Sequence, residues 1–269
     1  MRWQFIARTI GILLIFLGLS MMAPLLVSLH YHELAFDDFI HSIAITMVAG
    51  LILIIGSKKQ GSDDYINQKE GMATVALAWM AIGLFGALPF YFGPEFTSFT
   101  DAFFESVSGF TTTGSSVMTN IEGATKSILF WRSFIQWLGG MGIIVLSLAI
   151  LPFLGVGGIQ LYKAEVPSPV PDKLTPRLTD SAKILWAVYA VLTLVEIIFL
   201  LGGGMPLFEA SCHAFTTMPT GGFSPKNNSI AHYNSAYFDY VIVAFMVLAG
   251  INFSLYYQML RGKTLAFWK

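Results

Sequence analysis

Apolar residues occur along this chain in long blocks, which short polar stretches separate. A helix that crosses a bilayer needs about 20 mostly apolar residues, and six blocks have roughly that length. Two further helix-like blocks, at residues 99–107 and 205–215, are too short to cross. We therefore predict an all-α polytopic membrane protein whose spanning helices cover residues 9–29, 39–56, 71–92, 127–151, 182–201 and 237–258.

Each short helix is followed directly by a loop rich in threonine and glycine. The first loop is Gly109-Phe-Thr-Thr-Thr-Gly-Ser-Ser116, and the second is Thr216-Thr-Met-Pro-Thr-Gly-Gly-Phe-Ser224. Non-helical backbone is tolerated at membrane depth only where it is buried in protein or lines a water-filled cavity. Two such loops at equivalent positions predict a pore or a substrate site near the middle of the membrane.

Composition supports the membrane assignment. Hydrophobic residues make up 55% of the 269 positions, charged residues only 12%, and the mean hydropathy is +0.67. Soluble domains carry about 25% charged residues, so we expect the lipid bilayer and no nucleic acid as a partner. The single cysteine, Cys212, excludes an intramolecular disulfide. The apolar run from Ile10 to Leu29 is too long for a signal-peptide core and predicts a retained first helix.

The distribution of basic residues predicts the orientation. If the N-terminus lies inside, only three of the 15 lysines and arginines fall outside, namely Lys126, Arg132 and Lys226. Cytoplasmic segments of membrane proteins carry the excess of lysine and arginine. We therefore expect a cytoplasmic N-terminus.

The order of elements repeats along the chain. A span, a short helix, a Thr/Gly loop and a second span occur twice, and Gly114 and Gly221 lie 107 residues apart. Both units enter the membrane from the same side, which predicts parallel repeats around an axis along the membrane normal. The expected organisation is two N-terminal helices, a first pore repeat, a cytoplasmic connector and a second pore repeat, at residues 1–70, 71–154, 155–181 and 182–269.

The chemistry of the loops suits a cation. Moving a bare ion into a low-dielectric interior costs on the order of tens of kcal/mol, so oxygen ligands must replace its water. Backbone carbonyls supply oxygens without formal charge, so that the ion can also leave, and glycine allows the backbone angles that turn carbonyls inward. The C-terminal ends of the short helices would add partial negative charge. The pattern predicts a cation filter; the alternative is a purely structural break.

Three stretches resemble a known family. Phe103-Phe-Glu-Ser-Val-Ser-Gly-Phe-Thr-Thr-Thr-Gly-Ser-Ser116 is similar to the first filter of the Trk/Ktr/HKT superfamily of potassium transporters. Phe130-Trp-Arg-Ser-Phe-Ile-Gln-Trp-Leu-Gly-Gly-Met-Gly142 resembles the inner helix that follows it in the Trk branch, and His213-Ala-Phe-Thr-Thr-Met-Pro-Thr-Gly-Gly-Phe-Ser224 resembles that branch's second filter. The resemblance covers the chain from end to end.

The resemblance implies a potassium-uptake subunit of the bacterial inner membrane. It also implies a homodimer, gated by a cytosolic nucleotide-binding ring protein, with K⁺ as the transported ion and no covalent cofactor. By position, with Thr113-Gly114 aligned to Thr220-Gly221, the residues facing the ion would be Thr111, Thr112, Thr113, Gly114 and Ser115 in the first loop and Pro219, Thr220, Gly221 and Gly222 in the second.

The length of the chain departs from the family pattern. The family builds one pore from four such repeats in one polypeptide, whereas this chain has two. The third and fourth filters, the intramembrane gating loop and the late inner-helix arginine have no positions here. Two interpretations stay open: the chain is the N-terminal half of a longer protein, which its end at Lys269 favours, or two copies pair.

Several polar residues are expected to support the filter. Charges within spans are costly and usually paired, so Glu105 and Arg132 are predicted to form an ion pair; otherwise Arg132 reaches the outer headgroups alone. His213 is expected to make a packing hydrogen bond rather than to sense pH. Glu196 is predicted to reach the membrane surface or to face a cavity, with direct ion binding as the alternative. Asn252 is predicted to form an interhelical hydrogen bond, with a role in gating as the alternative.

Other residues of the spans are expected to have structural roles. Gly139, Gly140 and Gly142 predict close helix packing, with a hinge as the alternative. Tryptophans are expected at the interface or in the core rather than as ligands; these are Trp79, Trp131, Trp137 and Trp186.

Two other functions were considered. An intramembrane hydrolase would use Ser115 or Ser116 as nucleophile and His213 as base. No G-x-S-x-G string is present, however, and a hydrolase leaves the duplicated loop unexplained. The other alternative is an accessory or scaffold subunit without transport of its own, which the half-length chain keeps open.

Overall fold

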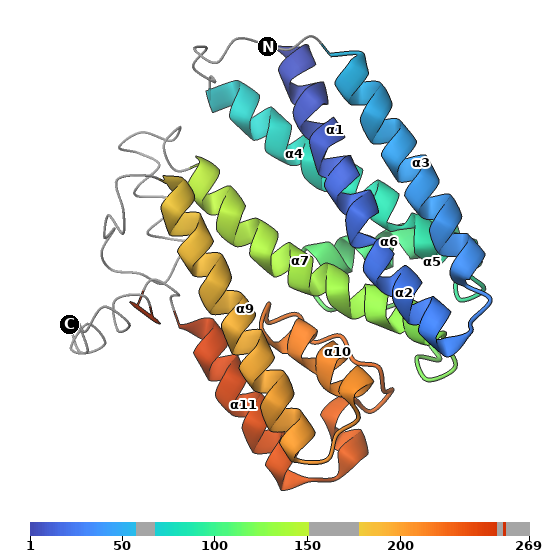
Figure 1. Cartoon of the computed structure of the whole chain (residues 1–269), viewed down its shortest axis with the longest axis vertical. Helices are drawn as coiled ribbons and strands as arrows, with labels where there is room; N and C mark the ends of the chain where they lie inside the picture. Colours follow the sequence, from blue (N-terminus) through green and yellow to red (C-terminus); the bar gives the residue numbers. More distant parts are fainter. Residues whose placement is uncertain (58–67, 151–177, 252–254, 257–269) are drawn as a thin grey trace.

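The computed structural model describes residues 1–57, 68–150, 178–251 and 255–256, and the elements within these ranges are all helical. The predicted all-α class is therefore confirmed for the described chain. The helices form a bundle in which α7 (Lys126–Ile150) is central, because it contacts α2, α4, α6, α9 and α10 (Figure 1).

The N-terminal part is a helical hairpin. It consists of α1 (Trp3–Ser20), α2 (Met22–Tyr31) and α3 (Phe36–Ile55). The single helix predicted over residues 9–29 is interrupted at Met21. Pro24 explains the break, because proline lacks an N–H and its ring crowds the carbonyl four residues earlier.

Two glycines set the crossing of α1 and α3. A Cβ added to Gly11 would lie 2.8 Å from the carbonyl oxygen of Gly50, and one added to Gly50 would lie 2.9 Å from that of Gly11. Small residues let membrane helices approach this closely.

The next four helices carry the first short helix. They are α4 (Gln68–Gly86), α5 (Leu88–Phe92), α6 (Phe99–Phe110) and α7. The side chain of Ser98 caps α6 by accepting from the backbone N–H of Thr100 at 3.2 Å. Trp131 is fully buried and donates its indole N–H to the Gly86 carbonyl at 3.1 Å, so this tryptophan belongs to the core that joins α4 to α7.

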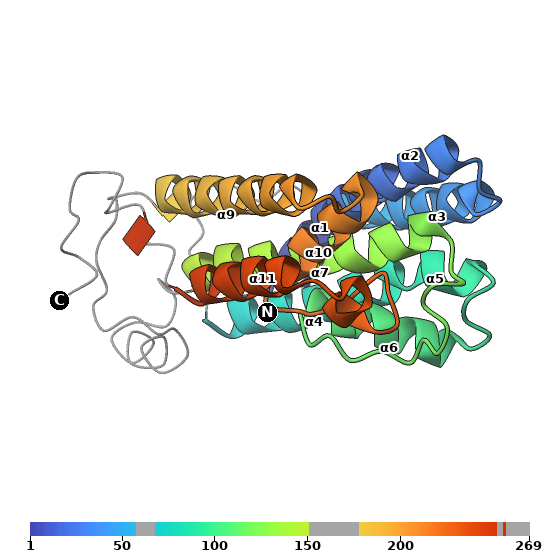
Figure 2. The ribbon, with the colours of Figure 1, turned by 90° about the horizontal axis from the view of Figure 1, so that it is seen from below.

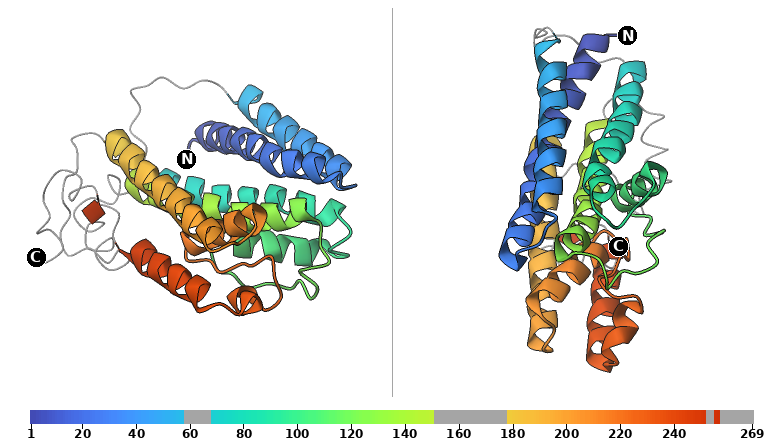
Figure 3. Two further views of the ribbon diagram at one scale, coloured as in Figure 1. Left: turned by 60° about the horizontal axis from the view of Figure 1, so that its bottom comes forward. Right: turned by 90° about the vertical axis from the view of Figure 1, so that its right-hand side faces the viewer.

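The C-terminal part contains the second short helix. It consists of α9 (Leu178–Gly202), α10 (Leu207–Thr217), the 3₁₀ turn η2 (Ser229–Tyr233) and α11 (Ala236–Gly250). Helices α9 and α11 lie side by side (Figures 1 and 2). Figure 3 shows the α1–α3 hairpin on one side of α4 and α7, and α11 on the other.

Within the described ranges, four segments are long and apolar enough to be candidate membrane spans: Trp3–Tyr31, Phe36–Ile55, Lys69–Phe92 and Ile184–Gly202. The helix predicted over residues 127–151 is present as α7. The described part of the last predicted span is the shorter apolar helix α11; part of residues 251–258, most of the connector 155–181 and Asn252 lie outside the described residues. Helices α6 and α10 have 12 and 11 residues, about 18 Å of length, too short to cross.

A carboxylate from the hairpin caps the central helix. Glu33 accepts from the backbone N–H groups of Lys126 at 2.6 Å and Ser127 at 3.0 Å, and from the Ser127 hydroxyl at 2.6 Å. An anion at a helix N-terminus is stabilised by the free N–H groups and the helix dipole. This contact fixes the hairpin to the helix on which both Thr/Gly loops rest.

Candidate ion filter

The two Thr/Gly loops share one backbone conformation. Thr112 and Gly114 have φ angles of 56° and 76°, and Thr220 and Gly222 have φ angles of 57° and 85°. A non-glycine residue in this left-handed region is uncommon, yet each loop has a threonine there, two positions before a left-handed glycine. The paired positions are 108 residues apart in both cases.

The hydrogen bonds of the loops match in the same way. The N–H groups of Thr113 and Gly114 point to the Ser108 carbonyl at 2.9 and 3.5 Å, and those of Gly221 and Gly222 point to the Thr216 carbonyl at 2.9 and 3.2 Å. These pairs are also 108 residues apart. The two short helices α6 and α10, which do not cross the membrane and are therefore half-helices, end in the same turn.

The predicted alignment of the loops is wrong by one residue. It paired Thr113-Gly114 with Thr220-Gly221, but the backbone pairs Gly114 with Gly222 and Thr113 with Gly221. An alignment by residue type superposes the Thr-Gly pairs of the two loops. Each turn instead has a glycine at its second left-handed position, which is Gly114 in the first loop and Gly222, not Gly221, in the second.

The structure brings the two loops into contact. A Cβ added to Gly114 would overlap the carbonyl oxygen of Gly221. The loops are also joined further out, because Asn227 accepts from the N–H of Ile121 at 3.0 Å and donates its own N–H to Glu122 at 3.2 Å. Two segments that are distant in sequence thus form one site.

The candidate filter residues differ in exposure. Exposed are Thr111, Thr113, Ser115, Thr220 and Gly222, whereas Thr112, Gly114 and Gly221 are half-buried. Pro219 is buried against α7, where a Cβ added to Gly140 would lie 2.6 Å from the proline Cβ. Five of the nine candidate residues are therefore exposed, while Pro219 packs against α7.

An ion pair lies directly behind the first loop. Arg132 Nε donates to Glu105 Oε1 at 2.5 Å, and both side chains are almost completely buried. The structure thus contains the expected Glu105–Arg132 pair. Glu105 also accepts from the Ser116 hydroxyl at 2.9 Å and from the Val117 N–H at 3.1 Å, so the carboxylate holds the end of the first loop.

The same arginine holds the second loop. Arg132 Nη1 donates to the Ser224 carbonyl at 2.9 Å, and its guanidinium carbon lies 3.9 Å from the centre of the Phe223 ring. Arginine suits this position because its planar group can make several hydrogen bonds and stack on an aromatic ring. The sequence indicated the partner Glu105 but contained no signal for Ser224 or Phe223.

A second side chain of α7 reaches the second loop and was not predicted. Gln136 is fully buried, and its Oε1 accepts from the Phe223 N–H at 3.1 Å. Gln136 follows Arg132 by one helical turn, which puts both on the same face of α7. That spacing, in the string Arg132-Ser-Phe-Ile-Gln136, is the only signal in the sequence that could have indicated it.

His213 makes the packing hydrogen bond that was expected. Its Nε2 lies 3.3 Å from the Tyr233 hydroxyl, which donates to Glu209 at 2.7 Å. Burial and the hydrogen bond to Glu209 raise the pKa of the Tyr233 phenol, so it remains a donor at neutral pH. Lys226 pairs with the same carboxylate at 3.1 Å. This network joins α10 to the segment that follows the second Thr/Gly loop.

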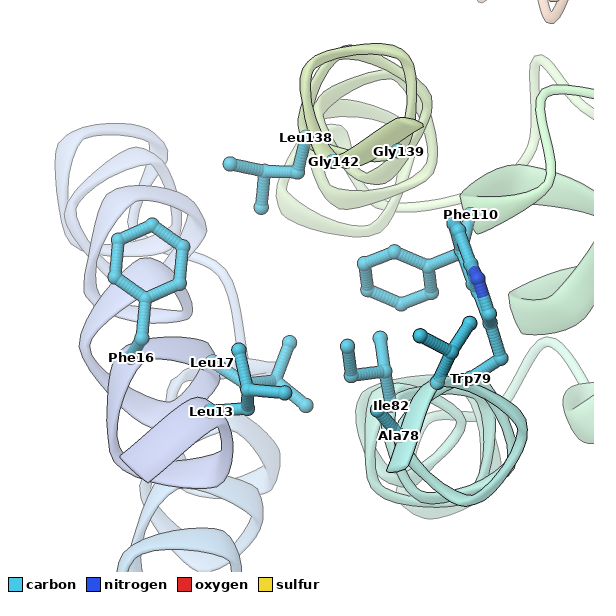
Figure 4. A pocket seen from close by; sticks show the side chains of 11 residues that line it. Leu13, Phe16, Leu17, Ala78, Trp79, Ile82, Phe110, Leu138, Gly139 and Gly142 are labelled. Carbon is cyan, nitrogen blue, oxygen red and sulfur yellow. The ribbon is translucent and has the colours of Figure 1, made fainter. Parts of the chain in front are cut away.

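The glycines of α7 have different environments. A Cβ at Gly139 would overlap the Phe110 carbonyl, and Gly140 touches the second loop, so the predicted close packing is confirmed for these two. Gly142 has nothing within 4 Å of an added Cβ among the described residues. It lines a cavity of about 220 Å³ whose walls are apolar, including Phe16 of α1 and Trp79 of α4 (Figure 4). The side chains that line it are apolar and offer no oxygen ligand.

Glu196 does not reach the membrane surface. It is fully buried, and neither carboxylate oxygen has a hydrogen-bond partner within the described parts of the chain. The prediction that it extends to the headgroups is therefore wrong, because packing of α9 against its neighbours covers it.

The structure does not support the hydrolase alternative. Ser116 donates a hydrogen bond to Glu105, and His213 is hydrogen-bonded to Tyr233.

Known proteins with the same sequence pattern are potassium transporters. The Trk system potassium uptake protein TrkH of Salmonella typhimurium is 40% identical over 273 aligned residues, which cover 100% of this chain and 56% of that protein. TrkI of Halomonas elongata, also named a Trk system potassium uptake protein, is 35% identical over 98% of this chain and 54% of its own length. The chain thus spans about half the length of the curated relatives it matches.

The fold agrees with these relatives. The crystal structure of the potassium transporter TrkH from Vibrio parahaemolyticus matches with a TM-score of 0.87 and 34% identity, over 100% of this chain and 55% of that one. The TrkH family, described as cation transport proteins, matches residues 36–267. Since the match covers most of the sequence, this chain belongs to the TrkH family of cation transport proteins.

Proposed function

We propose that this chain forms half of a potassium-selective pathway across the membrane. The filter would consist of backbone carbonyls and threonine hydroxyls from residues 111–115 and 219–222. The observation that carries the proposal is the identical turn at the end of α6 and α10, with the two loops in contact at Gly114 and Gly221. The naming of the relatives as potassium uptake proteins supports K⁺ as the ion.

The charges around the loops suit a cation that must bind and leave again. The Glu105 carboxylate behind the first loop is paired with Arg132. It therefore does not present an unpaired negative charge to the ion. The C-terminal ends of α6 and α10 contribute partial negative charge. Carbonyl dipoles and helix ends attract a cation without the tight binding that a formal charge would impose.

The open side of the loops is where we place the rest of the pore. Thr113, Thr220 and Gly222 are exposed, and polar loop backbone at membrane depth must contact protein or water. We propose that residues 71–154 and 182–269 are two parallel repeats of a four-repeat ring. The other two would come from a second copy of this chain or from a further polypeptide segment, as the greater length of the relatives suggests.

The remaining expectations follow from the family resemblance. The protein is proposed to lie in the bacterial inner membrane with a cytoplasmic N-terminus, to form a homodimer and to be regulated by a cytosolic nucleotide-binding subunit. The salt bridge from Arg2 to Glu70 at 2.9 Å supports a common side for the start of α1 and the start of α4.

Growth on limiting potassium tests the proposal. The chain would be expressed in a bacterial strain without its own potassium uptake systems, alone and together with a segment that carries two further repeats. We expect growth and uptake of K⁺ in preference to Na⁺ only with the complete set of repeats. Uptake by the chain alone as a monomer would refute the half-pore proposal, and no uptake in either case would favour an accessory role.

A further inference from the structure

Gln136 lies at the place where the two filter loops meet. Its Oε1 accepts from the Phe223 N–H at 3.1 Å, on the second loop. A Cβ added to Gly221 would lie 2.7 Å from its Nε2, and one added to Gly114 would lie 3.7 Å from the same atom. The amide therefore fills the space directly behind the contact between the loops.

The other end of this amide is unpaired. Gln136 is 0% exposed, and its Nε2 has no hydrogen-bond partner in the described ranges. A buried N–H without a partner costs free energy, so a leucine or methionine of similar size would pack there more favourably. The amide nevertheless lies within 4 Å of the positions that a Cβ would take at Gly114 and at Gly221.

Arg132 and Gln136 hold the second loop by successive residues. Arg132 donates to the Ser224 carbonyl, and Gln136 accepts from the Phe223 N–H. The arginine is also paired with Glu105, so it joins the half-helix of the first unit to the second loop. The glutamine contacts the junction itself, one turn deeper along α7.

From this geometry we infer that Gln136 is a positioning residue that determines ion selectivity, by setting the directions of the loop carbonyls at the Gly114–Gly221 contact. The inference rests on the proposed function. A carbonyl ring distinguishes two cations only if its oxygens are held at the spacing that suits one of them. The hydrogen bond from the Phe223 N–H restrains the second loop, and the amide fills the space behind Gly114 and Gly221, so that the backbone at the junction cannot move toward α7.

Two substitutions of Gln136 distinguish the contribution of its Oε1 acceptor from that of its Nε2 group. Gln136→Met keeps the length of the side chain and removes both polar groups. Gln136→Glu keeps the shape and the acceptor for the Phe223 N–H but replaces the Nε2 donors. The matched control is Thr193→Val, which removes the hydrogen bonds of a buried hydroxyl to Trp137 at 3.1 Å and to the Tyr189 carbonyl at 2.8 Å, both outside the two loops. All would be made in the assembled transporter, with its full set of repeats.

The measurement is the ratio of K⁺ to Na⁺ uptake in competition, together with the amount of protein in the membrane. We expect Gln136→Met to lower the ratio by about tenfold, which corresponds to roughly 1.4 kcal/mol. Gln136→Glu should give a smaller decrease, and Thr193→Val should keep the wild-type ratio. A residue needed only for folding would change the amount of protein and the maximal rate, not the ratio.

Each outcome decides the matter. Wild-type ratios in both glutamine variants, with selective uptake by the wild type, would overturn the inference and leave the proposed function intact. If Gln136→Met does not accumulate, the ratio of Gln136→Glu decides. If neither accumulates while Thr193→Val does, Gln136 is a folding residue and the inference is overturned. Absence of K⁺ uptake by the wild-type assembly would instead refute the proposed function, and the inference with it.

Discussion

The Arg132 guanidinium and the Glu105 carboxylate are joined by a hydrogen bond of 2.5 Å, both buried behind the first Thr/Gly loop. Each partner also forms hydrogen bonds to the loops. Glu105 accepts from the Ser116 hydroxyl and the Val117 N–H, and Arg132 donates to the Ser224 carbonyl. One pair of charges therefore positions the ends of both loops. Its removal should affect the two loops together rather than one of them.

Arg132→Ala should lower the free energy of unfolding by about 3–5 kcal/mol, because it leaves the Glu105 carboxylate buried and unpaired. Glu105→Gln combined with Arg132→Gln should recover part of this loss. Thermal unfolding of the purified protein in detergent measures both. The control is Lys226→Ala, which breaks a partly exposed pair with Glu209 and should cost only about 0–1 kcal/mol. If the double variant loses as much stability as the single variants Glu105→Gln and Arg132→Gln lose together, the two residues are not coupled.

Gly114→Ser should reduce the preference for K⁺ over Na⁺ in the assembled transporter. Gly114 has a φ angle of 76°, and an added Cβ would overlap the Gly221 carbonyl, so the serine must displace a filter oxygen. Competitive ion uptake is the measurement. Gly204→Ser is the matched control, since Gly204 has a φ angle of 93° but nothing within 4 Å of an added Cβ. Equal selectivity in the two variants would remove Gly114 from the filter.

Gly139→Ala should destabilise the protein, by roughly 1–3 kcal/mol as for other overpacked sites. The new methyl group would overlap the Phe110 carbonyl, at the end of the first half-helix. Gly142→Ala, three residues further along the same helix, meets no atom of the described residues within 4 Å and should be neutral or stabilising by about 0.5–1 kcal/mol, because alanine favours helix. The two melting temperatures compare the sites directly; similar losses in both would contradict the packing described for Gly139.

Glu33→Gln should weaken the cap of α7 by about 0.5–2 kcal/mol. Its carboxylate accepts three hydrogen bonds from Lys126 and Ser127, so amide hydrogen exchange at residues 126 and 127 should become faster. Asp37→Asn, an exposed residue of α3, should change stability by no more than about 0.5 kcal/mol. Unchanged exchange at the start of α7 would show that the hairpin does not stabilise this helix.

Much of the architecture follows from local properties of the sequence. The lengths of the apolar blocks predicted the membrane class, and the blocks at 99–107 and 205–215 correspond to α6 and α10. The Thr/Gly strings marked the loops, because threonine and glycine supply oxygens and left-handed backbone. The Glu105–Arg132 pair was also predictable, since a charge at membrane depth needs a partner and few candidates were within reach.

The contacts that join the loops were decided by tertiary structure alone. Three features depend on how α7 and α9 pack against α10: the contact of Gly114 with Gly221, the hydrogen bonds that join Arg132 to Ser224 and Gln136 to Phe223, and the burial of Glu196. The residues joined by these hydrogen bonds are 87 to 92 positions apart in the sequence. Helical periodicity relates only residues a few positions apart, so it could not predict these contacts. The sequence determines which segments can form helices and filter turns; only packing decides which side chains of α7 hold the two turns together.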